Sequence, residues 1–174
     1  MNAFVTADLH LGHSKSLSFL TPSGERLRPF ESIDEMHHVL ISRWNKVVGP
    51  KDRVYILGDV AITRQSLTFL PEFNGKKVLV KGNHDIFKLK DYLPYFEDIR
   101  GAFVRDGLIF THIPIHRDSF EGRYIGNVHG HLHCHFVQNS LGLYDDRYYS
   151  ACVERHNFYP VALEEVKVFF KDYE

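Results

Sequence analysis

Several apolar runs of this chain each end at a side chain that can bind a metal ion, and two more such side chains form a late histidine cluster. These residues are Asp8, His10, Asp59, Asn83, His112, His131 and His133. Because an α/β sheet binds ligands just beyond the carboxyl ends of its strands, we expect them to gather at one sheet edge. Carboxylates, an amide oxygen and several imidazoles in one place would suit two divalent ions, and such centres perform phosphoryl chemistry.

The expected ligand set would leave this centre positively charged. Two divalent ions bring four positive charges, of which Asp8 and Asp59 neutralise two. Such a centre attracts phosphate and lowers the pKa of a bridging water. Mixed nitrogen and oxygen ligands suit Mn, Fe, Zn, Ni or Co better than Mg or Ca, and we take Mn as the favoured ion. Two ions about 3.5–4 Å apart need a shared carboxylate, and Asp59, alone after its apolar run, is the natural bridge.

The first half of the chain alternates between strand and helix patterns. Apolar runs at 3–7, 54–57 and 77–80 predict strands, and a short helix is expected at 65–69. A longer helix should begin at Ser32, which forms a capping-box pattern with Glu35, and should stop at Gly49-Pro50. This alternation favours a partly parallel sheet with helices outside it.

After Pro94 the pattern changes to short strands. Residues 102–111 predict a hairpin that turns at Asp106-Gly107. Further strands are expected at 127–129, 136–137 and 148–153, and the apolar run 166–170 is expected to close a sheet edge. The elements together indicate a mixed α/β class, and we expect one domain over residues 1–174.

The bulk composition is that of an ordinary globular protein. The 174 residues carry a formal net charge of −1, so any phosphate substrate must be attracted locally by the site itself. We therefore expect neither a membrane partner nor, from charge alone, a nucleic-acid partner. The 2 cysteines, Cys134 and Cys152, have no disulfide or zinc-motif spacing, which favours a cytoplasmic location.

The ordered motifs resemble a known family. The signature of the calcineurin-like metallophosphoesterases is matched, in order, by Asp8-x-His10, Gly58-Asp59, Gly82-Asn83-His84-Asp85, His112 and Gly130-His131-x-His133. The chain is most similar to small, capless members from bacteria or viruses, and residues 153–160 also look like such members. The resemblance implies a four-layer sandwich of two mixed β-sheets flanked by helices.

The resemblance also implies a role for each motif residue. One metal would be held by Asp8, His10, Asp59 and His133, and the other by Asp59, Asn83, His112 and His131. A metal-bridging hydroxide would attack phosphorus. His84 would contact the phosphoryl group or protonate the leaving group, and Asp85 would accept a hydrogen bond from His84 and orient it.

The substrate class is less sharply indicated. We expect a small phosphomonoester or phosphodiester, with small diesters or nucleotides favoured, and the candidates for substrate contact are His13, Arg28 and Arg117. Two alternatives stay open: a metal-dependent nuclease, which the near-neutral charge disfavours, and a non-catalytic metal-binding scaffold. The presence of both His84 and Asp85 argues against the scaffold.

Overall fold

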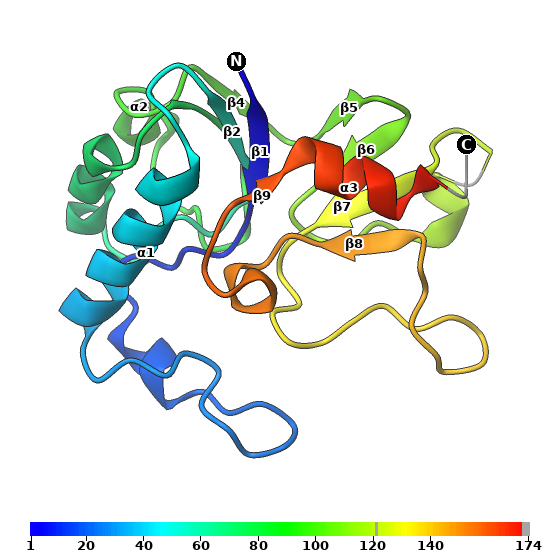
Figure 1. The fold of residues 1–174 in the computed structure, drawn as a ribbon, viewed down its shortest axis with the longest axis horizontal. Helices are drawn as coiled ribbons and strands as arrows, with labels where there is room; N and C mark the ends of the chain where they lie inside the picture. The colour runs from blue at the N-terminus through cyan, green and yellow to red at the C-terminus, as the bar shows by residue number, and fades with distance from the viewer. Residues whose placement is uncertain (121, 172–174) are drawn as a thin grey trace.

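The strands form two mixed sheets in the residues that this computed structural model describes, 1–120 and 122–171 (Figure 1). The first sheet has the strand order β4-β3-β2-β1-β9 and the second β5-β6-β7-β8. The strands of the first sheet are β1 (Ala3–Thr6), β2 (Arg53–Ile56), β3 (Lys76–Val80), β4 (Asp98–Arg100) and β9 (Val161–Ala162). Those of the second are β5 (Phe103–Arg105), β6 (Leu108–Phe110), β7 (Gly126–His129) and β8 (Tyr148–Ser150).

Parallel pairing places the carboxyl ends of several strands together. In the first sheet β1 to β4 run parallel, with Val5 opposite Tyr55 and Tyr55 opposite Val78, while β9 pairs antiparallel with β1. In the second sheet β6, β7 and β8 are parallel. The loops that leave β1, β2, β3, β6 and β7 are those that carry the metal-binding motifs.

The predicted hairpin is present. Strands β5 and β6 pair antiparallel, with Arg105 opposite Leu108. The two turn residues, Asp106 and Gly107, have φ of 52° and 74°, the left-handed values that a type I′ turn requires. The hairpin starts the second sheet at its outer edge.

The long helix also begins where the capping box predicts. Helix α1 (Ile33–Val47) starts after Ser32, whose hydroxyl accepts the Glu35 N–H at 3.1 Å. The Glu35 carboxylate accepts the Glu31 N–H at 2.6 Å, so it reaches one residue beyond the usual partner. The helix buries Leu40 and Trp44 against the outer face of the first sheet. Figure 1 shows α1 and α2 on that side of the sheet.

The remaining helical segments are short. They are η1 (Ser14–Ser18), η2 (Gln65–Glu72), α2 (Leu89–Tyr92), η3 (Arg117–Ser119), η4 (Val153–His156) and α3 (Leu163–Phe169). The described elements therefore form an α/β arrangement of two mixed sheets flanked by helices, as predicted. None of the described helices is long and apolar enough to cross a bilayer.

Two strand predictions are wrong. The run 166–170 lies in and just after α3, where Val166 and Phe170 fill the core between the sheets. A short apolar run lacks the periodicity that separates a strand from a helix, which explains this error. Residues 136–137 join no sheet of the described chain, and the neighbouring Gln138 forms only an isolated bridge to Tyr144.

Replacing Ser32 with alanine should destabilise the protein by about 1 kcal/mol, because the N–H of Glu35 loses its cap. Urea unfolding followed by circular dichroism would measure the change. The matched variant Ser32→Asp keeps a capping oxygen and should unfold close to the wild-type midpoint. Equal loss in both variants would show that the cap does not contribute.

Candidate metal centre

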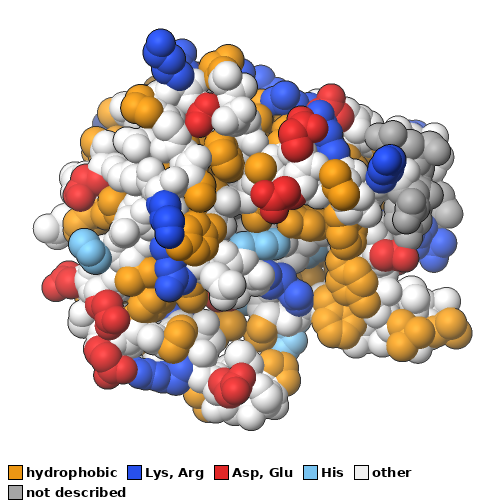
Figure 2. All heavy atoms as spheres, in the orientation of Figure 1, with side chains coloured by type: hydrophobic (Ala, Val, Ile, Leu, Met, Phe, Trp, Pro, Cys, Tyr) orange, Lys and Arg blue, Asp and Glu red, His pale blue; other side chains and the backbone are white. Residues whose placement is uncertain are grey.

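Backbone hydrogen bonds join the motif-bearing loops at one edge of the sheets. The N–H of Asp8 donates to the carbonyl of Gly58 at 3.0 Å, and that of His10 donates to the carbonyl of Asp59 at 2.9 Å. In the second sheet the N–H of Gly130 donates to the carbonyl of His112 at 2.9 Å. Figure 2 shows histidine side chains near the middle of one face, beside a hollow bordered by hydrophobic and basic side chains.

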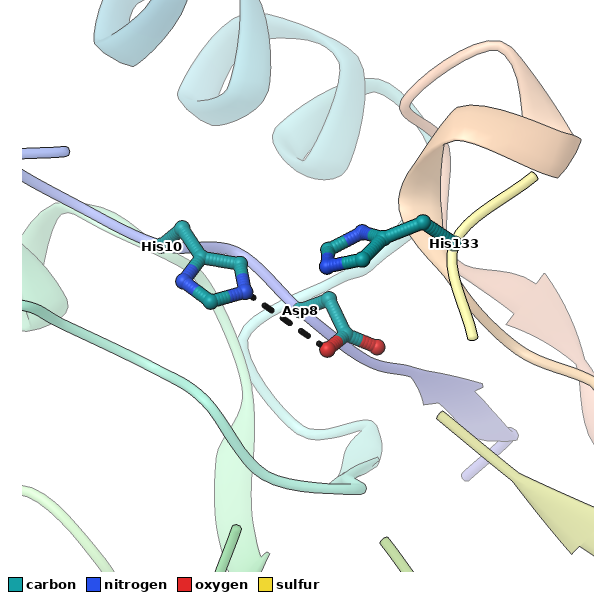
Figure 3. A group of neighbouring side chains, drawn as sticks. All are labelled: Asp8, His10 and His133. Carbon is teal, nitrogen blue, oxygen red and sulfur yellow. Dashed lines mark ion pairs between the residues drawn. The ribbon is translucent and has the colours of Figure 1, made fainter. Parts of the chain in front are cut away.

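Two clusters of ligand atoms form at this edge. The first metal group consists of Asp8, His10 and His133, and the second metal group consists of Asp59, His112 and His131. Within each group the potential ligand atoms all lie within 4.8 Å of one another. Figure 3 shows the first group, in which the loops after β1 and β7 bring the three side chains together.

Asp8 has one oxygen that is held by the protein and one that faces the first group. Its Oδ2 accepts the N–H of His131 at 2.9 Å and the thiol of Cys152 at 3.2 Å. Its buried Oδ1 has no hydrogen-bond partner among the described residues and lies 3.6 Å from His10 Nε2. The pair is drawn as a dashed line in Figure 3. An unpartnered buried carboxylate oxygen is costly unless a cation satisfies it, so this atom fits a metal ligand.

Asp59 belongs to the second group and also comes close to the first. Its Oδ1 accepts the backbone N–H of His84 at 2.8 Å. Its Oδ2 lies 3.6 Å from Nε2 of His10 and 3.4 Å from Nε2 of His112. Burial acts to raise the pKa of Asp59, but His112, the His84 N–H and His10 outweigh it and hold the pKa at about 2. Asp59 is therefore a carboxylate within reach of both groups.

His112 and Asn83 face each other through Nε2 and Oδ1, two atoms that can each donate an electron pair to a metal ion. Nδ1 of His112 donates to the carbonyl of Leu57 at 2.7 Å, and its Nε2 lies 2.8 Å from Asn83 Oδ1. With Nδ1 carrying a proton, Nε2 needs a second proton or a cation to face that oxygen. Burial acts to lower the pKa of His112, but Asp59 and other partners raise it above its ordinary value. The pair fits a shared cation.

The backbone at the motif residues is strained. Positive φ angles between 49° and 70° occur at Asp8, His10, Asp59, His131 and His133. The left-handed region is rare for residues other than glycine and costs about 1–3 kcal/mol each, and such strain clusters at functional sites. These turns aim the side chains at a common point, which an extended or helical backbone would not do.

Close packing of the loops requires glycine beside both aspartates. A Cβ at Gly82 would lie 2.2 Å from Asp59 Oδ1, and one at Gly130 would lie 2.6 Å from Asp8 Oδ2. Movement of a flexible side chain could not relieve either overlap, because a backbone atom also lies close to each added Cβ. The distance is 2.6 Å at Gly82 and 2.9 Å at Gly130. Glycine at these two positions thus leaves the space that the Asp59 and Asp8 carboxylates occupy.

Two further histidines border the first group. The ring of His84 is exposed and lies 5.5 Å from the ring of His10, edge to face. His13 lies 5.4 Å from His10 and 5.5 Å from Phe19, between ring centroids. Burial and the neighbouring His10 lower the pKa of His13 to about 4, so its ring is neutral at physiological pH. Both histidines can therefore meet a molecule that approaches the metal groups.

The structure corrects the expectation for Asp85. Its buried carboxylate accepts the backbone N–H groups of Asp59, Val60 and Gly82 at 2.9, 3.0 and 2.8 Å. Both oxygens are directed at the backbone of the two loops, so Asp85 joins the loops instead of accepting a hydrogen bond from the His84 ring. Burial raises the pKa of Asp85 despite these hydrogen bonds.

The expectation for Arg28 is also wrong. The side chain is only 1 % exposed and donates to the carbonyls of Asp8 and Leu9 and to Glu154, so it cannot meet a substrate. Arg117 is exposed in η3, beside a cavity of about 480 Å³ that Gln138 and Tyr148 also line. The residues lining this cavity include no member of the two metal groups.

Sequence reasoning missed two side chains that touch the ligands. The thiol of Cys152 donates to Asp8, and Glu154 accepts from Nδ1 of His133 at 2.9 Å. Burial, together with Asp8, raises the pKa of Cys152, so the thiol keeps its proton. Burial acts to raise the pKa of Glu154, but Arg28 and His133 hold it at about 2. Both residues come after the last histidine motif in the sequence, and no known motif spacing connects them to its ligands.

Comparison with known proteins identifies the class to which this site belongs. The family model of the calcineurin-like phosphoesterases matches residues 1–171, so the chain belongs to this family. Members of this family are metal-dependent phosphoester hydrolases, and the two metal groups agree with that class.

Similar proteins cover the chain to different extents. An uncharacterized protein of Methanocaldococcus jannaschii is 30% identical over 166 residues, which cover 92% of this chain and 86% of that protein. The Gene 66 protein of Mycobacterium phage L5 is 30% identical over 89 residues, 48% of this chain and 40% of the phage protein. The crystal structure of a protein of unknown function from Aquifex aeolicus shares the fold, with a TM-score of 0.70 at 21% identity, covering 96% of this chain and 98% of that one.

Replacing Gly82 with alanine should displace the Asp59 carboxylate, because the added Cβ would overlap with its Oδ1. We expect the free energy of unfolding to fall by about 1–3 kcal/mol and metal binding to weaken. Urea unfolding and metal titration would measure both effects. The matched control is Gly101→Ala, where a Cβ meets nothing within 4 Å. A Gly82 variant with wild-type metal affinity would contradict the close-packing argument.

Replacing Asp59 with asparagine should weaken both metal groups together, because the carboxylate oxygen between His10 and His112 loses its charge. Elemental analysis after dialysis against Mn would report the metal content. The control Asp146→Asn alters an exposed carboxylate and should keep the wild-type content. Selective loss of a single ion would show that Asp59 serves one site.

Proposed function

We propose that this chain is a dinuclear metal-dependent phosphoesterase that hydrolyses small phosphodiesters, with phosphomonoesters as the second class of substrate. The observation that supports it most strongly is the position of Asp59, within 3.6 Å of His10 and 3.4 Å of His112. A carboxylate of one cluster that also reaches the other is what two neighbouring ions need as a shared ligand.

The donor atoms divide into two sites that share Asp59. The first would be made by Asp8, His10, Asp59 and His133, and the second by Asp59, Asn83, His112 and His131. Bound divalent ions, with Mn favoured, would polarise the phosphoryl group and lower the pKa of water. Mixed nitrogen and oxygen donors favour transition-metal ions over Mg or Ca.

His84 would protonate the leaving group. Its backbone N–H is bound to Asp59 Oδ1, which places the residue beside the proposed bridge. Its exposed ring lies next to the ring of His10, so a substrate held at the metal groups would come within its reach. Histidine is the side chain that most often serves as a general acid in catalysis.

A groove beside the second metal group supports a small substrate. It has a volume of about 470 Å³ and is lined by Lys81, Asn83, His112 and Ile113, among others. Asn83 and His112 belong to the proposed second site, so the groove opens directly from it. A small diester or a nucleotide could place its non-reacting group there, with Lys81 near its negative charge.

The test is hydrolysis of one aryl phosphodiester and one aryl phosphomonoester by purified protein loaded with Mn, beside metal-stripped protein. The proposal expects turnover that requires metal and is higher for the diester. Metal-dependent turnover of the monoester alone would assign a phosphatase instead. Two bound ions without turnover of either ester would favour the scaffold alternative.

Replacing His84 with alanine should leave metal content unchanged and lower kcat by about 10²–10⁴-fold for esters with poor leaving groups. The loss should shrink for leaving groups of low pKa, because these depart without a proton. A series of aryl esters would measure the dependence. The control His38→Ala removes an exposed histidine of α1 and should have no effect. An equal loss across the series would contradict the role of proton donor.

A further inference from the structure

A buried ion pair lies directly behind the first metal group. Arg28 and Glu154 are separated by 126 positions in the sequence, yet Arg28 Nε and Nη2 donate to Glu154 Oε1 at 2.8 and 2.6 Å. Their side chains are 1 % and 3 % exposed. A charged pair this deep is costly to desolvate, and burial alone does not explain its presence at this place.

Glu154 contacts one side of the first metal group. The same oxygen that accepts from Arg28, Oε1, lies 2.9 Å from Nδ1 of His133. A carboxylate at this nitrogen keeps the proton on Nδ1, and the electron pair on Nε2 is then free to bind a metal. Nε2 is the His133 nitrogen that faces away from Glu154.

Arg28 contacts the other side of the group. Its Nη2 donates to the carbonyl of Asp8 at 2.5 Å, and its Nη1 donates to the carbonyl of Leu9 at 2.9 Å. These carbonyls belong to the turn in which Asp8 and His10 have φ of 61° and 49°. The planar guanidinium therefore binds the strained turn and Glu154 at once, a geometry that lysine could not reproduce.

We propose that Glu154 is a positioning residue for His133, and that Arg28 couples it to the Asp8–His10 turn, so that the pair orients the ligands of the first metal site. This inference rests on the metal sites of the proposed function. It predicts that loss of the pair weakens the first metal site more than the second. The described contacts of the pair reach His133 and the Asp8–His10 turn, whereas His112 of the second metal group is oriented by the carbonyl of Leu57.

The experiment is a Mn titration of purified wild-type and Glu154→Gln protein, with bound ions counted by electron paramagnetic resonance. In the variant we expect one of two ions to bind about 10–100-fold more weakly, with the other unchanged. The matched control is Glu165→Gln, an exposed carboxylate of α3. Adding His133→Ala to Glu154→Gln should weaken that ion no further than His133→Ala alone, since Glu154 acts through this ring.

Each outcome bears on a separate claim. Wild-type protein that binds no metal would overturn the proposed function itself. Wild-type protein with two ions, and a Glu154 variant with unchanged affinities or with equal loss at both sites, would overturn the positioning role alone. Equal loss at both sites would show that the pair only stabilises the fold.

A second measurement keeps the inference testable if Glu154→Gln does not fold. The ¹⁵N chemical shifts of the His133 ring in wild-type protein report its tautomer, before and after loading with diamagnetic Zn. We expect a proton on Nδ1 in both states and a Zn-dependent shift at Nε2. A proton on Nε2, or Zn binding at Nδ1, would overturn the inference.

Discussion

The site depends on two aspartates, each of which accepts a backbone N–H at one oxygen and directs the other oxygen at the candidate ligand histidines. Asp59 receives the His84 N–H at Oδ1 and keeps Oδ2 between His10 and His112. Asp8 receives the His131 N–H at Oδ2 and keeps Oδ1 free of partners among the described residues. Because the hydrogen-bonded oxygen restricts the orientation of the carboxylate, the second oxygen is held in position before any ion arrives.

This preorganisation is stabilised by the rest of the fold. Parallel pairing brings the loops to one edge, and the backbone there adopts left-handed angles that isolated loops would avoid. Asp85 offsets part of that strain, since its carboxylate binds three backbone N–H groups of the loops around Asp59 and Gly82. Arg28 does the same for the turn after β1 through the carbonyls of Asp8 and Leu9.

Local signals were reliable where the stabilising contacts are local. The capping box at Ser32 and the Asp106-Gly107 turn both act over a few residues, and both elements formed where predicted. The strand predicted at 166–170 is wrong, because the apolar residues of this short run have no periodicity that distinguishes a strand from a helix. Its conformation follows from the space between the sheets that Val166 and Phe170 fill.

The sequence by itself determined the identity and order of the candidate ligands, because metal chemistry restricts the side chains that can serve and strand ends restrict where they occur. The structure brought six of those residues into two neighbouring groups, with Asp59 of the second group close to His10 of the first, and placed Asn83 against His112. Only the tertiary structure decided which further side chains contact and orient these ligands. Arg28 meets Glu154 across 126 positions, and His133 meets Glu154 across 21. Contacts at such separations arise from the packing of whole elements, and no local pattern in the chain encodes them.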